Sequence, residues 1–288
     1  MTIQWYPGHI AKAERKLAEA LKLVDVTIEV VDARLPVSTV NPRLRKAMAA
    51  KPTLTLLNKA DLADPAQNKA WLKAFQQERE AALLYDAHSG KTRQRLIEAL
   101  TALGEAKMQA LTAQGRKRRP VRVMVVGMPN VGKSTVINSV VGRRKTRTGH
   151  KAGVTRASQW IRIHPDVELM DTPGIIPPRL DDEQTGLKLA WVSSVSDAAF
   201  DEEIAAQALL SYLSALYPQT IRASLRLPAD AALTLDAMAA SRGYLARGGQ
   251  ADILRTARAA LSEFRQGRLG RLTLEFHPSG AADMLLLQ

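Results

Sequence analysis

A glycine-rich loop that directly follows an apolar run restricts this chain to a small set of folds. The run, Val121 to Val126, is typical of a buried strand, and the loop after it, Gly127 to Ser134, fits the pattern GxxxxGK[ST]. We expect residues 133–142 to form the helix that follows. A strand, a loop and a helix in this order gather backbone N–H groups and the positive end of a helix dipole around a phosphate. The sequence therefore predicts a nucleotide-binding α/β fold.

Two side chains of this loop have predicted roles. Lys133 is expected to reach the β- and γ-phosphates, and the Ser134 hydroxyl to ligate Mg²⁺. The remaining loop residues that we expect to contact the nucleotide are Asn130, Val131, Gly132 and Thr135.

A second motif, Asn58-Lys59-Ala60-Asp61, follows another strand-like run, Thr53 to Leu57. The Asp61 carboxylate can accept from both N1–H and the exocyclic amine of guanine, and adenine offers no such donor pair. A site built on hydrogen bonds of this kind can reject the analogue that lacks them by about 10⁴-fold. Asn58 and Lys59 would brace the loop and flank the ring. After a third run, residues 82–85, Asp86 and Ala87 form the base-edge loop, in which the Ala87 N–H would meet the guanine carbonyl.

The order of these motifs is unusual, because ordinary P-loop GTPases carry the phosphate loop first and the base reader near the end. The chain therefore looks circularly permuted. After the strand expected at residues 167–170 comes Asp171-Thr172-Pro173-Gly174, in which Asp171 would hold Mg²⁺ through a water and the Gly174 N–H would contact the γ-phosphate. Thr155 is the candidate switch threonine for Mg²⁺ and the γ-phosphate. Ile175 stands where Ras-like proteins place the glutamine that orients water, so we expect slow intrinsic hydrolysis.

Alternating strand and helix patterns over residues 1–178 predict a mostly parallel sheet flanked by helices. Pro177-Pro178 breaks the pattern, and residues 179–288 have helical periodicity throughout, so we expect a separate all-helical domain there. Because the Asp171–Gly174 strand end comes last in the first domain, the switch segment leads directly into the helical one. We therefore expect loss of the γ-phosphate to reorient the helical domain.

Charge is distributed unevenly along the chain. The net charge is +13, but residues 1–180 hold 31 basic and 15 acidic groups, whereas residues 181–288 hold 10 and 13. Two basic clusters, residues 116–119 and 143–156, flank the predicted phosphate loop and its helix, which favours a nucleic-acid partner over a merely solvated face. The chain has no cysteine, which excludes disulfides and cysteine zinc sites. No membrane-length apolar run or leader is visible, so a soluble cytoplasmic protein is expected.

Taken together, these residues resemble the circularly permuted ribosome-biogenesis GTPases of the YlqF/RbgA type. The resemblance runs nearly end to end, and it includes Gln-Trp-Tyr-Pro-Gly-His at 4–9, Asp-Ala-Arg-Leu-Pro at 32–36, Gly-Tyr-Leu-Ala-Arg-Gly-Gly at 243–249 and Gly-Arg-Leu-Gly-Arg at 267–271. It implies a GTPase that binds GTP and GDP, acts on the maturing large (50S) ribosomal subunit and its rRNA, and leaves after hydrolysis. We expect the protein to be a monomer.

The resemblance also implies substitutes for the missing glutamine. Asn130 matches an asparagine that helps to hold K⁺, and His9 matches a histidine suggested to position water, although a histidine at a helix start can equally serve to pack or cap. Ala152 replaces the family's usual proline, and Asp86 stands where serine or asparagine is common. The helical domain resembles an RNA-contacting module, and its candidate RNA-binding side chains are Arg242, Arg247, Arg255, Arg258, Arg265, Arg268 and Arg271.

Two other functions fit parts of the pattern. Ile175 leaves open an RNA-binding assembly chaperone whose nucleotide site is structural and hydrolytically idle. The phosphate loop alone would also fit a small-molecule kinase or an ATPase, which would prefer ATP.

Overall fold

The computed structural model describes residues 7–78, 81–141, 160–170 and 183–278. Its centre is a six-stranded sheet with the order β3-β2-β1-β4-β6-β5. The strands are β1 (Val26–Asp32), β2 (Thr53–Asn58), β3 (Ala81–Leu84), β4 (Val121–Gly127), β5 (Trp160–His164) and β6 (Val167–Met170).

The predicted α/β class is confirmed, since every pair in the sheet is parallel except β5–β6. Strand β1 is buried at all seven positions, as expected of a central parallel strand covered on both faces. The antiparallel strand β5 lies at the edge, where it pairs with β6 alone. Parallel strands place their carboxyl ends at one edge of the sheet, which is where loops that bind ligands gather.

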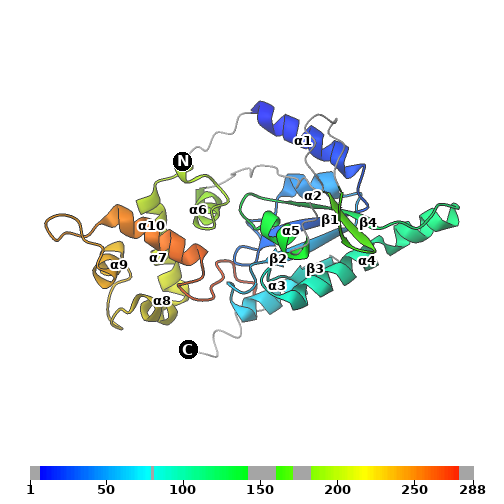
Figure 1. Ribbon diagram of the computed structural model, residues 1–288. Helices are drawn as coiled ribbons and strands as arrows, with labels where there is room; N and C mark the ends of the chain where they lie inside the picture. The colour runs from blue at the N-terminus through cyan, green and yellow to red at the C-terminus, as the bar shows by residue number, and fades with distance from the viewer. Residues whose placement is uncertain (1–6, 79–80, 142–159, 171–182, 279–288) are drawn as a thin grey trace.

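Helices cover both faces of the sheet (Figure 1). On one face lie α4 (Gly90–Ala113) and α5 (Lys133–Val141), and on the other lie α1 (Pro7–Leu21), α2 (Pro42–Met48) and α3 (Pro65–Gln77). Strand β4 shows why both faces need cover. Its residues Val123 and Val125 enter the α4–α5 core, whereas Met124 and Val126 enter the core beneath α1 and α2.

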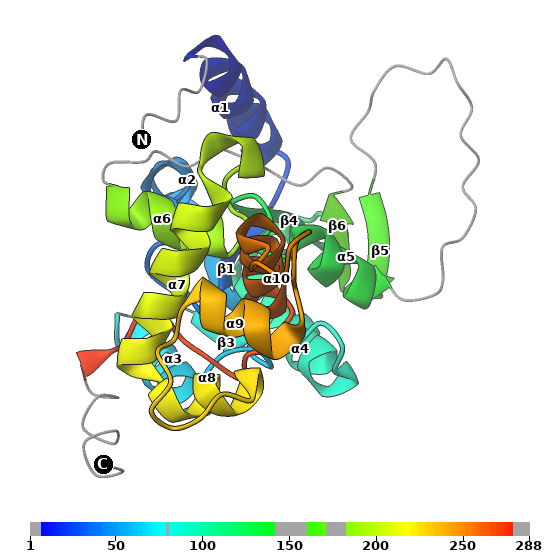
Figure 2. The same cartoon turned by 90° about the vertical axis from the view of Figure 1, so that its left-hand side faces the viewer.

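The residues after 182 form a group of helices beside the sheet, as expected from their periodicity (Figure 1), and in Figure 2 these helices lie in front of the sheet. The helices are α6 (Glu183–Trp191), the 3₁₀ turn η1 (Asp197–Ala199), α7 (Glu202–Leu216), α8 (Pro218–Leu225), α9 (Leu235–Arg242) and α10 (Ile253–Arg265). Their apolar faces share one core, in which Leu209, Leu213 and Phe264 are buried. Leu35, from the segment after β1, enters the same core and joins the two parts of the chain.

The segment after α10 returns to the sheet and lies in the seam between the two parts. Leu272 N donates to Leu62 O at 3.0 Å and Leu274 N donates to Arg34 O at 2.9 Å. The Trp71 indole of α3 donates to Glu275 O at 2.7 Å. Residues 272–275 therefore fasten the helices to the sheet, a role that could not be assigned from the sequence.

None of the helices in the described part of the chain has the length and hydropathy needed to cross a membrane.

Candidate functional site

The two strands on either side of β1 deliver the base-reading loop and the phosphate loop to one edge of the sheet. In the strand order, β1 lies between β2 and β4. Strand β2 ends at Asn58, the first residue of the base-reading motif, and β4 ends at Gly127, the first residue of the phosphate loop. Because all three strands are parallel, motifs that lie far apart in the sequence meet across β1.

The phosphate loop has the backbone of an anion-binding nest. Gly127, Asn130 and Gly132 have φ of +146°, +56° and +99°. These positive values turn successive N–H groups inward at the start of α5, where the helix dipole favours negative charge. Gly132 has no room for a side chain, since a Cβ there would lie 2.2 Å from Asn58 Nδ2.

Lys133 is buried at the first position of α5, and its ammonium group donates to Met128 O. No carboxylate of the described residues pairs with it. Burial lowers the pKa of Lys133 to about 8, because the charged form loses its hydration. A phosphate in the loop would restore this pKa by supplying the missing negative charge, so the lysine fits the predicted role. The neighbouring side chains of Ser134 and Thr135 are exposed and face no described partner that would block a metal or phosphate.

The base-reading loop is bonded directly to the phosphate loop. Asn58 Nδ2 donates to Val131 O at 2.8 Å, and Lys59 Nζ donates to Asn130 O at 2.8 Å. Lys59 also pairs with Asp32 at 2.8 Å and has φ of +59°. Asn58 Oδ1 is buried and has no hydrogen-bond partner among the described residues. These contacts fit the predicted bracing roles of Asn58 and Lys59.

The base edge is formed by Asp61 and the turn after β3. Asp61 is half-buried, and no hydrogen bond or ion pair joins its carboxylate to another described residue. Ala60 N donates to Tyr85 O at 3.1 Å, which ties this loop to the Asp86–Ala87 turn. Asp86 Oδ1 accepts from His88 N at 2.8 Å, so its side chain stabilises the turn before α4. This leaves the Ala87 N–H as the donor that we expect at the base.

Several predicted site residues cannot be placed. Thr155, Asp171, Gly174 and Ala152 lie outside the described residues. His9 belongs to α1, but nothing is described of its side chain. Of the Mg²⁺ ligands, only Ser134 is therefore placed, at the start of α5 beside the buried lysine. Within the described ranges no cluster of three His, Cys, Asp or Glu side chains could hold a metal, so the fit to Mg²⁺ rests on the hydroxyl and on nucleotide phosphates.

The phosphate loop also contacts the helical part of the chain, which sequence analysis missed. Asn130 Nδ2 donates to Ser193 O at 2.7 Å, and the buried Ser194 hydroxyl donates to Pro129 O at 2.9 Å. Ser193 has φ of +61°, a conformation that costs a non-glycine residue about 1–3 kcal/mol. The Asn130 amide nitrogen is thus engaged, and its oxygen is the atom left to ligate a cation.

The seven arginines proposed for RNA differ in their surroundings. Five of them make contacts within the protein, and two of these contacts, Arg255 with the Tyr244 ring and Arg258 with Glu202, involve exposed arginine side chains. Arg265 Nη2 donates to Ala190 O at 2.8 Å at the end of α6, Arg271 Nη2 to Ala60 O at 3.2 Å, and Arg242 pairs with Glu263 at 2.8 Å. Arg271 is nevertheless exposed, as are the remaining four, Arg247, Arg255, Arg258 and Arg268.

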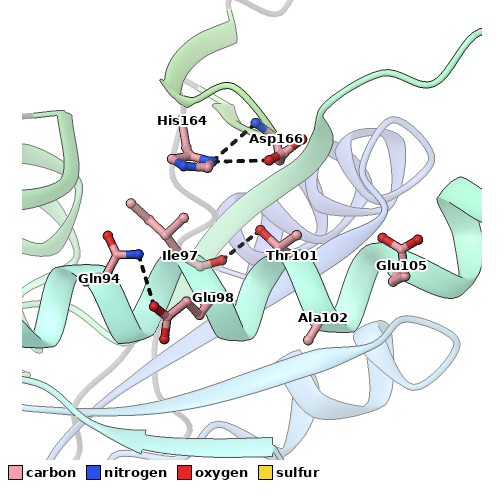
Figure 3. A pocket seen from close by; sticks show the side chains of 8 residues that line it. All are labelled: Gln94, Ile97, Glu98, Thr101, Ala102, Glu105, His164 and Asp166. Carbon is pink, nitrogen blue, oxygen red and sulfur yellow. Dashed lines mark hydrogen bonds and ion pairs between the residues drawn. The ribbon is translucent and has the colours of Figure 1, made fainter.

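A separate pocket of about 380 Å³ lies between α4 and the turn before β6 (Figure 3). Its polar lining includes Glu98, Glu105, His164 and Asp166, and His164 Nδ1 lies 3.6 Å from the Asp166 carboxylate. Because β6 begins at Val167, this pocket lies at the amino edge of the sheet, opposite the nucleotide loops. It therefore takes no part in the candidate site.

Known proteins are similar to this chain in both sequence and fold. A family model described as a 50S ribosome-binding GTPase matches residues 122–213. The ribosome biogenesis GTPase A of Bacillus cereus is 39% identical over 96% of this chain and 94% of its own length. The protein of that name from Thermotoga maritima is 32% identical over 95% of this chain and 94% of its own length. The crystal structure of GNP-bound YlqF from T. maritima has a TM-score of 0.69 at 27% identity, and covers 92% of this chain and 98% of that chain.

Proposed function

The chain belongs to the ribosome biogenesis GTPase A family, and from this membership we propose that it binds the maturing large (50S) ribosomal subunit, promotes a late assembly step and leaves after GTP hydrolysis. One observation carries the nucleotide part of the proposal. The base-reading loop and the phosphate loop are held together by the bonds of Asn58 to Val131 O and of Lys59 to Asn130 O. Such a pair of loops recognises a guanine base and its phosphates as one ligand.

The roles proposed at the phosphates follow from charge. Lys133 would neutralise the β- and γ-phosphates, since its ammonium is buried and has no described carboxylate partner. A GTPase domain of this kind uses Mg²⁺, and we assign it to Ser134, Thr155 and Asp171. The Gly174 N–H would hold the γ-phosphate. When bound, Mg²⁺ stabilises the negative charge that develops on the transferred phosphoryl group.

Hydrolysis by the free protein should be slow, because Ile175 cannot orient the attacking water. We propose that the large subunit and K⁺ supply the missing stabilisation. Asn130 is the proposed K⁺ ligand, and its amide is held by Ser193 O with the oxygen left available. His9 is the proposed water-positioning residue.

The proposed rRNA contact uses the exposed arginines of the helical part. Arg247 and Arg268 are exposed, and Arg255 lies 4.5 Å from the centre of the Tyr244 ring, which holds its guanidinium in place. Arg258 pairs with Glu202 at the surface. We keep Arg242, Arg265 and Arg271 in the proposal only as residues that support this surface. Because ribosome assembly is the work of its relatives, we further propose that the protein acts in the cytoplasm, as a monomer.

One sequence feature favours a second function. Ile175 would also suit an RNA-binding assembly chaperone whose nucleotide site is structural and hydrolytically idle. In that case GTP would stabilise the fold without being turned over.

GTP turnover separates these functions. We would measure it with and without large ribosomal subunits, in K⁺ and in Na⁺, for the wild type and for Asp61→Asn. We expect stimulation by large subunits and by K⁺, and GTP should outcompete ATP for the wild type but less strongly for the variant. No stimulation under any condition would refute the enzyme function, and a preference for ATP would refute the guanine assignment.

A further inference from the structure

Asp32, at the end of β1, is a buried carboxylate to which the nucleotide site assigns no contact with the ligand. It has no exposed surface. Its Oδ2 accepts from Lys59 Nζ and from Arg34 Nη2, each at 2.8 Å, and its Oδ1 accepts from Arg34 Nε at 2.9 Å. One carboxylate therefore binds two cationic side chains, Lys59 of the base-reading loop and Arg34 of the segment after β1.

The charge of Asp32 is permanent at physiological pH. Burial alone would raise the pKa of Asp32, but the Arg34 guanidinium and the Lys59 ammonium outweigh burial and hold this pKa well below its usual range. A buried ion pair loses much free energy when one partner is removed, because the other charge stays buried without compensation. The positions of Lys59 and Arg34 therefore both depend on Asp32.

The other contacts of Lys59 and Arg34 lie in different parts of the protein. Lys59 continues into the nucleotide site through its bond to Asn130 O. Arg34 continues into the helical part, where its Nη1 donates to Phe264 O at 3.1 Å and its guanidinium lies 4.9 Å from the centre of the Phe264 ring. Phe264 O is one of the last carbonyls of α10 and also accepts from Gly267 N at 3.0 Å, and carbonyls at this end of a helix attract positive charge.

We propose that Asp32 is a positioning residue that joins the guanine-reading loop to the end of α10, so that nucleotide binding stabilises the contact between the sheet and the helical part. The inference rests on the proposed function, because a guanine nucleotide must occupy the site. Bound nucleotide restricts Lys59, which fixes the shared carboxylate and with it Arg34. Such coupling is reciprocal. If bound nucleotide strengthens the contact of Arg34 with α10 by a given factor, loss of that contact must lower the nucleotide affinity by the same factor.

Asp32→Asn tests the proposal, and Glu29→Gln is its matched control. Glu29 lies on the same strand, is buried and pairs with Arg45 at 2.8 Å, but it contacts neither loop of the nucleotide site in the interactions described for it. Both variants lose a buried carboxylate charge. The measurements are the Kd for GDP and the hydrogen-exchange protection that GDP adds to residues 262–270. We expect Asp32→Asn to weaken GDP binding by about tenfold or more and to abolish the added protection, within the usual range of coupling between sites. Glu29→Gln should change neither by more than about twofold, since distant sites act independently.

Arg34→Lys is the second variant, and it tests the proposed coupling even if Asp32→Asn does not fold. It keeps a positive charge beside Asp32 but loses the planar fork that also reaches Phe264 O. Although Arg34 has no place in the nucleotide site, this variant should weaken GDP binding about fivefold, at the lower end of typical coupling. Equal GDP affinity in Arg34→Lys and the wild type, or equal effects of Asp32→Asn and Glu29→Gln, would overturn the inference while leaving the proposed function intact. A wild-type protein that binds no GDP would overturn both.

Discussion

Nucleotide binding should take up a proton at mildly alkaline pH, because Lys133 is buried without a carboxylate partner among the described residues. Its pKa in the free protein is lowered from 10.5 to about 8 by burial. Bound diphosphate restores the charged form of Lys133. Between pH 8 and pH 10.5 the complex therefore carries a lysine proton that the free protein has lost.

The pH dependence of the folding stability has the opposite sign to that of the nucleotide affinity. The unfolded chain keeps its ordinary lysine pKa, so between pH 8 and pH 10.5 it binds more protons than the free folded protein. The free energy of unfolding of the nucleotide-free protein should therefore rise with pH through this window, whereas nucleotide affinity should fall. No other described group of the phosphate loop is needed for this effect.

The magnitude follows from the position of the pKa. With a pKa of about 8, the free protein has lost about three quarters of this proton at pH 8.5 and about a tenth at pH 7. GDP binding should therefore take up about 0.75 proton at pH 8.5 and about 0.1 at pH 7, and the affinity should fall about fourfold between the two, or ~0.8 kcal/mol.

Isothermal titration calorimetry with GDP and Mg²⁺, in two buffers of different ionisation enthalpy, measures this uptake at each pH. The matched variant is Lys133→Arg, whose guanidinium stays charged throughout the range and should abolish the uptake at pH 8.5. An uptake at pH 8.5 as small as that at pH 7 in the wild type would refute the reasoning, whether or not the variant binds GDP.

Two further predictions concern the loops. Gly132→Ala should weaken GDP binding at least about 30-fold, measured with a fluorescent GDP analogue, because its φ of +99° and a Cβ only 2.2 Å from Asn58 Nδ2 cost ~2 kcal/mol or more. Gly186→Ala, where a Cβ meets nothing within 4 Å, should leave the Kd unchanged and stabilise α6 by up to about 1 kcal/mol; equal Kd values for the two variants would contradict the steric argument. Ser194→Ala should lower the free energy of unfolding in urea by about 1–3 kcal/mol, because it leaves Pro129 O without its buried donor. An unchanged urea midpoint would show that this contact contributes nothing to stability.

The fold was predictable from the sequence because its signals are local. The apolar runs of β1, β2 and β4, rich in valine, isoleucine and leucine, identify a buried parallel sheet, and the glycines of the phosphate loop identify where one strand turns into a helix. The meeting of Asn58 with the phosphate loop could also be expected, since parallel strands end at the same edge.

The contacts between the two parts of the chain could not be predicted in the same way. Asn130 donates to Ser193 O, and Arg265 and Arg271 donate to the carbonyls of Ala190 and Ala60. A carbonyl acceptor can belong to any residue, so these bonds leave no pattern in residue type or spacing. An arginine that caps a helix end and an arginine that faces RNA look alike in sequence. Only the packing around each of them separates the two roles.

These contacts also add to the coupling between the nucleotide site and the helical part that the permuted order predicts. The switch segment that leads into α6 lies outside the described residues, so its predicted movement stays a prediction. The described residues add two direct links, at Asn130–Ser193 and at Arg34–Phe264. The first starts from the phosphate loop and the second from the segment after β1, and neither passes through the switch segment.

Co-sedimentation with large ribosomal subunits tests the central claim most directly. The protein would be mixed with subunits in the presence of GDP or of a non-hydrolysable GTP analogue, and the bound fraction measured. We predict clearly stronger retention with the analogue, because in the proposed function the bound γ-phosphate holds the helical part in its binding position and hydrolysis releases it. Equal retention with both nucleotides, or stronger retention with GDP, would contradict the account.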